Sequence, residues 1–119
     1  MLHSMSGETA DAEVTFLEAL VRKNPNFVDA LIPLAEMYTQ KGLYEKGLVI
    51  DKRLAQLKKE DPVVHYNLAC SFALLEQTTE ALTALARAIS LGYSDFEHMQ
   101  RDRDLKNLHD HPEFRKLIS

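Results

Sequence analysis

The sequence predicts an all-α fold built from two stacked helical hairpins, with one helix before them and a short helical cap after them. Apolar and small residues recur at three- and four-residue spacing along most of the chain, which is typical of amphipathic helices. The pattern of residues 28–61 returns 34 residues later in residues 62–93. No stretch alternates apolar and polar residues as a half-buried strand would. These observations indicate a single domain over residues 1–119 that is a helical repeat array.

Residues 62–93, PVVHYNLACSFALLEQTTEALTALARAISLGY, form the part that we expect to be most enclosed. The stretch reads as two amphipathic helices with a break at residues 76–78. Small residues stand where the two helices of each hairpin must approach closely. Ala69 and Ala81 hold these positions here, and Ala35 and Gly47 hold them one repeat earlier.

The run from His65 to Tyr93 is similar to the pattern W-Y-N-L-G-x-x-Y…E-A-x-x-x-x-x-x-A-L-x-L-D-P of the tetratricopeptide repeat (TPR) family, whose period is 34 residues. His65 stands where this pattern has tryptophan. Asp51 stands where a large apolar residue is usual, so we expect the second helix of the earlier repeat to be locally shifted. The resemblance implies a right-handed solenoid that binds other proteins.

Residues 8–23 predict a lone helix that ends at Asn24-Pro25. A loose tail is expected over residues 1–7, and Ser6 or Thr9 is expected to cap the helix that follows. By the repeat period, this helix resembles the second helix of a repeat whose first helix is absent. Residues 26–40 and 44–58 predict the next hairpin, turning at Gly42. Pro33 predicts a kink or a late helix start.

Residues 94–119 resemble the terminal element seen after many bacterial TPR arrays, G-Y-x-D…D-x-D-L-x-x-L-x-x-x-P-x-F-x-x-L. Ser94-x-x-Glu97 predicts a capping box, and His111-Pro112 predicts the start of a last helix. An array exposes an apolar face at its last repeat, so the segment is expected to act as a lid. The expected lid residues are Phe96, Met99, Leu105, Leu108, Phe114 and Leu117.

Composition limits the function classes. The net charge is −4 with both signs interspersed, so binding to nucleic acid is not expected. No 18-residue apolar run is present and the start lacks a secretory pattern, so neither membrane insertion nor secretion is expected. The single cysteine, Cys70, is typical of a reducing compartment, and we expect a cytoplasmic protein.

No catalytic, cofactor or metal site is predicted. His109-Asp110-His111 is the densest group of possible ligands, but two histidines at this spacing diverge on a helix. Helix capping explains Asp102 and Asp104 better than paired carboxylate chemistry does. Cys70 and His65 lie on different faces of one helix, which disfavours a nucleophile pair.

The TPR resemblance implies a concave groove lined by the first helix of each hairpin. The groove residues it implies are Asp29, Ile32, Glu36, Thr39, Gln40, Val63, Tyr66, Asn67, Cys70 and Ala73. An alternative is that the chain's own terminal segments fill these contacts. The lysine-rich face of residues 44–58 reads as a solvated helix face, with docking of an acidic partner as its alternative.

Three functions remain open at this level. The favoured one is an interaction module or adaptor that binds a peptide or partner protein in the groove. The alternative is a structural module that forms homo-oligomers through the exposed edge of the truncated first repeat. An enzyme using the terminal histidine and aspartate residues is disfavoured.

Overall fold

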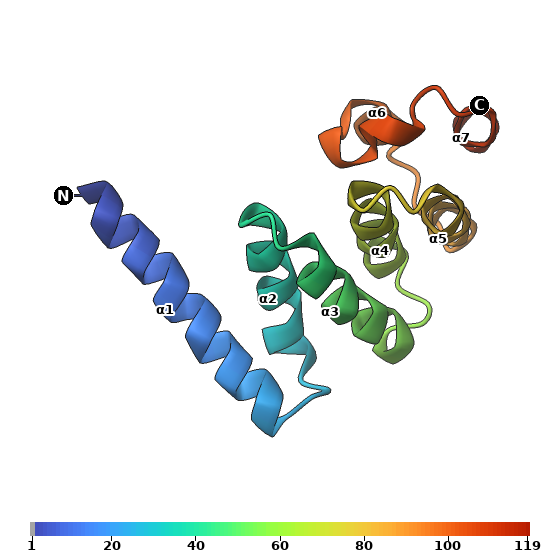
Figure 1. Ribbon diagram of the computed structural model, residues 1–119. Coiled ribbons are helices and arrows are strands. Elements are labelled where there is room, and N and C mark those ends of the chain that lie inside the picture. Colours follow the sequence, from blue (N-terminus) through green and yellow to red (C-terminus); the bar gives the residue numbers. More distant parts are fainter. Residues whose placement is uncertain (1) are drawn as a thin grey trace. The chain divides into compact units, whose positions relative to one another are not determined.

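A computed structural model describes residues 2–119 of the chain, with side chains described from Asp11 onward. Over this range it contains α-helices and one 3-10 helix but no strand (Figure 1), which confirms the all-α class. The elements are α1 (Leu2–Lys23), α2 (Val28–Gln40), α3 (Tyr44–Leu57), α4 (Pro62–Leu74), α5 (Thr78–Ser90), α6 (Phe96–Arg101), η1 (Arg103–Leu108) and α7 (Pro112–Ile118). They form two compact units, residues 1–57 and 58–119, and the single domain expected from sequence stays a prediction.

The first unit contains α1 and the hairpin of α2 and α3. Gly42 makes the hairpin turn with a φ of +77°, a conformation that glycine adopts without steric cost. A Cβ atom on Gly47 would lie only 3.3 Å from Thr39 Oγ1 and 3.8 Å from the Ala35 carbonyl oxygen. The close approach expected between Ala35 and Gly47 is therefore confirmed.

Helix α1 begins at Leu2, so the loose tail expected over residues 1–7 is wrong from residue 2 onward. Between residues 2 and 7 the residue that disfavours a helix most is Gly7, and glycine costs only about 1 kcal/mol relative to alanine. The cap expected at Ser6 or Thr9 concerns side chains outside the described residues. The predicted end of the helix at Lys23 is confirmed.

Helix α1 is attached to the hairpin by polar contacts as well as by packing. The Tyr38 hydroxyl donates a 2.5 Å hydrogen bond to a carboxylate oxygen of Glu18. Burial, followed by this bond to Glu18, raises the pKa of Tyr38 to about 12, so the hydroxyl keeps its proton. Lys41, just after α2, forms an ion pair with Asp11 of α1.

Two irregular positions of the first hairpin are accommodated within helices. Pro33 lies inside α2, which already begins at Val28, so the expected late start does not occur. Asp51 lies buried in α3, and that helix is continuous from Tyr44 to Leu57.

The second unit begins with the hairpin of α4 and α5. Asp61 starts α4, because its side chain accepts hydrogen bonds from the backbone N–H groups of Val63 and Val64 at 2.9 and 3.3 Å. Glu76 makes the turn with a φ of +59°, at the position that Gly42 holds 34 residues earlier. The two hairpins therefore use the same left-handed turn, once with glycine and once with glutamate.

The terminal segment consists of α6, η1 and α7. Asp95 rather than Ser94 caps α6, accepting a hydrogen bond from the His98 N–H at 3.1 Å, so the predicted capping box is wrong by one residue. Asp95 directly precedes Phe96, the first residue of α6, so its carboxylate is at the N-cap position. His111 caps α7 through Nδ1, which accepts from the Glu113 N–H at 3.1 Å, as predicted.

This segment covers the second hairpin as a lid, which confirms the sequence prediction. It packs on α4 through η1 and on α5 through η1 and α7. Met99, Leu105, Leu108 and Phe114 are fully buried in one core with the small residues of α4 and α5. Phe96 and Leu117 are partly buried against the same core.

In the part of the chain that the structure describes, no helix combines the length and the apolar character needed to cross a bilayer.

Candidate functional site

The predicted groove residues on α2 lie on an open helix face. Asp29, Ile32, Glu36 and Gln40 are exposed, and Ile32 keeps 40% of its surface accessible. Thr39 is half-buried, and its hydroxyl donates to the Ala35 carbonyl oxygen at 3.1 Å. An apolar side chain flanked by carboxylates is therefore presented to solvent on this helix.

The predicted groove residues on α4 divide into two sets. Val63 is 53% exposed, and Asn67 is exposed as well. Tyr66, Cys70 and Ala73 are buried, with only 4% of Tyr66 accessible. The expectation that these three face an open groove is therefore wrong, because η1 of the same chain packs on α4. For α4 the alternative expectation applies, in which the chain's own terminal segment fills these contacts.

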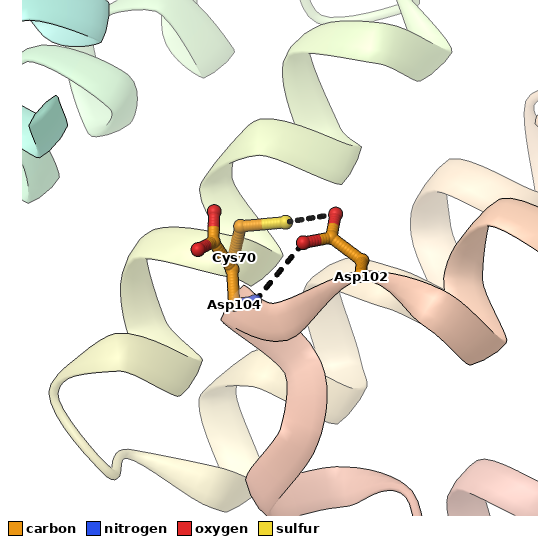
Figure 2. Close-up of side chains that lie close together, drawn as sticks. All are labelled: Cys70, Asp102 and Asp104. Carbon is orange, nitrogen blue, oxygen red and sulfur yellow. Dashed lines mark hydrogen bonds between the residues drawn. The ribbon is translucent and has the colours of Figure 1, made fainter.

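Asp102, just before η1, is the centre of the contact between this segment and α4. One of its oxygens, Oδ2, accepts a 2.6 Å hydrogen bond from the Tyr66 hydroxyl and a 3.8 Å contact from Cys70 Sγ. The other oxygen, Oδ1, accepts from the Asp104 N–H at 3.0 Å and so caps η1. Figure 2 shows the Asp102 carboxylate reaching the Cys70 sulfur and the start of η1.

Aromatic and imidazole rings enclose this contact. The Tyr66 ring stacks on the Tyr93 ring with centroids 4.2 Å apart and planes 6° from parallel. His98 Nε2 lies 3.3 Å from Asp102 Oδ2, one helical turn away on α6. The Tyr66 hydroxyl is therefore held between the ring stack and the carboxylate.

The electrostatics of this cluster favour protonated donors. Burial is the main cause that raises the pKa of the Tyr66 hydroxyl, with nearby Cys70 and Asp102 adding to it. Burial, followed by the charge of Asp102, also raises the pKa of the Cys70 thiol well above its ordinary value. A thiol that keeps its proton is a weak nucleophile and a poor metal ligand.

Cys70, Asp102 and Asp104 are the described residues whose donor atoms lie close enough to be considered for a metal ion, within 4.8 Å of one another (Figure 2). A cation here would have to displace the thiol proton and the hydrogen bonds that Asp102 accepts. The donor set therefore fits a hydrogen-bonded support for the lid better than a metal centre. Asp102 is a cap, as predicted, whereas Asp104 lies inside the first turn of η1.

The other groups considered for chemistry are separated by the fold. His109 Nε2 lies 3.0 Å from the Met99 carbonyl oxygen. Asp110 pairs with Arg115 at 3.2 Å, and His111 caps α7. His65 Nε2 lies 2.8 Å from the Lys59 carbonyl oxygen, away from Cys70. Each of these side chains holds a local backbone or surface contact.

Sequence reasoning missed the partnership of Tyr66 with Asp102 and Tyr93. Tyr66 and Asp102 are separated by 36 residues, and the repeat pattern contains no signal that pairs them. One feature could have indicated this hydrogen bond. Tyr66 is a tyrosine at a position expected to face a groove, and Asp102 is an acidic residue just before a helix of the lid.

No family model matches the chain. The chain is similar to a protein of Arabidopsis thaliana whose name describes it as chloroplastic, with 32% identity over 84 residues. The match covers 68% of this chain and 25% of that protein, so the chain corresponds to about a quarter of that relative's length.

Proposed function

We propose that this chain is a non-catalytic TPR-like interaction module that binds a peptide or partner protein through the exposed face of its first hairpin. The single observation behind this proposal is that the chain binds a polypeptide segment on the corresponding face of α4. There, the terminal segment packs on α4 through η1, Asp102 reaches Tyr66 and Cys70, and Tyr66, Cys70 and Ala73 are buried. A face of this kind is therefore suited to holding a short segment of chain.

The corresponding face of α2 is open. By the 34-residue register, Ile32 corresponds to Tyr66 and Glu36 corresponds to Cys70. Tyr66 and Cys70 are buried under the lid, whereas Ile32 and Glu36 are exposed within the first unit. In the proposed complex Ile32 is the apolar anchor, since a few side chains that become buried at the centre of an interface carry most of its binding energy.

The finer parts of the proposal follow from the repeat register. The 34-residue period and the small residues at both hairpin crossings support a TPR-like right-handed array, with the lone helix and the cap at its ends. A cytoplasmic location and a bacterial-type origin belong to the same proposal. The word "chloroplastic" in the relative's name describes that protein, of which this chain matches 25%.

Capture of partners from the source cell tests this function. Ile32→Ser should lose the partners that bind wild-type protein, because it removes the apolar anchor without changing the core. Val49→Ser is the matched control, since Val49 is 58% exposed on α3 and lies outside the proposed face. Equal capture by wild type and Ile32→Ser would place any binding site elsewhere.

A second candidate function is self-assembly through α1. Phe16 is 55% exposed, although it corresponds in the repeat register to Ile50 and Ala84, which are both buried in their own hairpins. The face of α1 around Phe16 is therefore exposed, whereas the equivalent positions of α3 and α5 are buried. Sedimentation of wild type and Phe16→Glu would show a dimer only for wild type if this face pairs with another copy.

A further inference from the structure

We infer that the partner segment recognised by α2 carries a basic side chain next to an apolar one. This inference rests on the proposed function and adds the chemistry of the partner. The surface concerned is the α2 face, defined as Asp29, Ile32, Glu36 and Gln40, which are all exposed.

The charge of the α2 face is entirely negative. Helix α2 contains Asp29 and Glu36 and neither lysine nor arginine. Ile32 lies three residues after Asp29 and four before Glu36, so the apolar side chain stands between two carboxylates on one helix face. The nearest basic residue after the helix, Lys41, is engaged with Asp11. A complementary segment needs a cation beside its apolar side chain.

The lid on α4 shows how an occupant matches such a face. It places an acceptor, the Asp102 carboxylate, opposite two donors, the Tyr66 hydroxyl and the Cys70 thiol. It also buries Leu105 in the same core. The lid thus combines a hydrogen-bond acceptor, Asp102, that is complementary to the donors of α4 with an apolar anchor, Leu105.

On α2 the donors are replaced. Ile32 has no hydroxyl where α4 has Tyr66, and Glu36 has a carboxylate where α4 has the Cys70 thiol. An occupant in the same geometry must therefore supply a donor where the lid supplies Asp102. Arginine suits this position best, because its planar guanidinium donates two parallel hydrogen bonds to a carboxylate.

The same comparison disfavours a second copy of this chain as the occupant. Its terminal segment would place Asp102 opposite Glu36, so two carboxylates would meet. Within its own chain, that segment already covers α4. The α2 face is therefore suited to a different polypeptide.

Selection from a random peptide library, displayed on phage, tests the inference on the full chain. Peptides selected by wild type should be enriched in arginine or lysine next to a large apolar residue. Synthetic copies of these peptides should bind Glu36→Gln about two- to fivefold more weakly, as expected for one exposed ion pair. Glu45→Gln, which changes an exposed carboxylate on α3, should bind them as wild type does.

The outcomes separate the partner chemistry from the proposed function. Selected peptides without a basic residue, whose binding is unaffected by Glu36→Gln but lost in Ile32→Ser, would overturn the inferred chemistry and leave the binding face standing. If no selected peptide depends on Ile32, the proposed face falls and the inference falls with it. Circular dichroism of each variant should match wild type, so that loss of binding is not loss of folding.

Discussion

Asp102 shows how one carboxylate connects distant parts of the second unit. It caps η1 through Oδ1 and accepts the Tyr66 hydroxyl through Oδ2, so the start of the 3-10 helix and the face of α4 share one side chain. The nearby Asp104 is placed less favourably. Burial, followed by the negative charge of Asp102, raises its pKa above the ordinary value of 3.8, although nearby His98 acts in the opposite direction.

This arrangement predicts that Asp104→Asn stabilises the protein at neutral pH. Because the folded-state pKa lies above the unfolded value, the folded chain holds this proton more tightly, and stability falls as pH rises through the raised pKa. Asparagine cannot ionise, so the variant should lose this part of the pH dependence. Urea unfolding from about pH 4 to neutral pH measures both effects.

Glu60→Gln is the control for this prediction, because it removes a carboxylate that is exposed to solvent. It should leave the pH dependence of stability close to that of wild type. If Asp104→Asn is less stable than wild type at neutral pH, the ionised carboxylate contributes favourably and the argument from burial is wrong.

At the scale of the element, each hairpin depends on a left-handed turn and on small residues at the helix crossing. Gly42 and Glu76 both have positive φ, and only the first is the residue type that adopts it freely. The crossing of α4 and α5 contains Ala69 and Ala81, which are both fully buried. Close packing of this kind leaves no room for a larger side chain.

We therefore expect Ala81→Leu to destabilise the protein by roughly 1–3 kcal/mol or more, because the added carbons must separate the two helices. Ala69→Leu should have a similar effect. Thr83→Leu is the matched control on the same helix, since Thr83 is exposed and its hydroxyl donates to the Thr79 carbonyl oxygen at 3.0 Å. Equal losses at all three positions in denaturant unfolding would show that small size at the crossing is not required.

At the scale of the molecule, we expect stability to depend on the terminal lid. Within the described residues, the repeat array that we propose has two hairpins and one further helix, fewer than the three or so repeats that stacked arrays usually need. The lid supplies the missing apolar contacts, because Met99, Leu105, Leu108 and Phe114 are buried in one core with α4 and α5. Fully burying one large apolar side chain contributes ~1.5–3 kcal/mol, and a whole domain is stable by only about 5–15 kcal/mol.

Phe114→Ala should therefore cost about 3–5 kcal/mol in the free energy of unfolding. Phe114 is 1% exposed, whereas Phe16 on α1 is 55% exposed, so Phe16→Ala is a control with the same chemical change. Removal of the segment after Ser94 should leave a chain that aggregates or unfolds without cooperativity. A truncated chain that melts as sharply and at the same temperature as wild type would show that the segment is no lid.

The sequence alone determined the helices and most of their ends, because these depend on local patterns. Three- and four-residue spacing, Gly42 at a turn and Pro112 at a helix start are read within a few residues of the chain. The lid was also predictable, since its apolar residues follow a repeat whose last face would otherwise be exposed. The start of α1 and the cap at Asp95 were missed, because competing local signals there differ by about 1 kcal/mol or less.

Only the tertiary structure decided which predicted groove residues are open. Tyr66 and Ile32 occupy the same position in two repeats, so the sequence pattern assigns them the same role. The lid covers Tyr66, because Asp102 and Leu105 pack with α4 from more than thirty residues along the chain. Ile32 is exposed within the first unit. Such long-range contacts depend on how elements pack, and no local pattern encodes them.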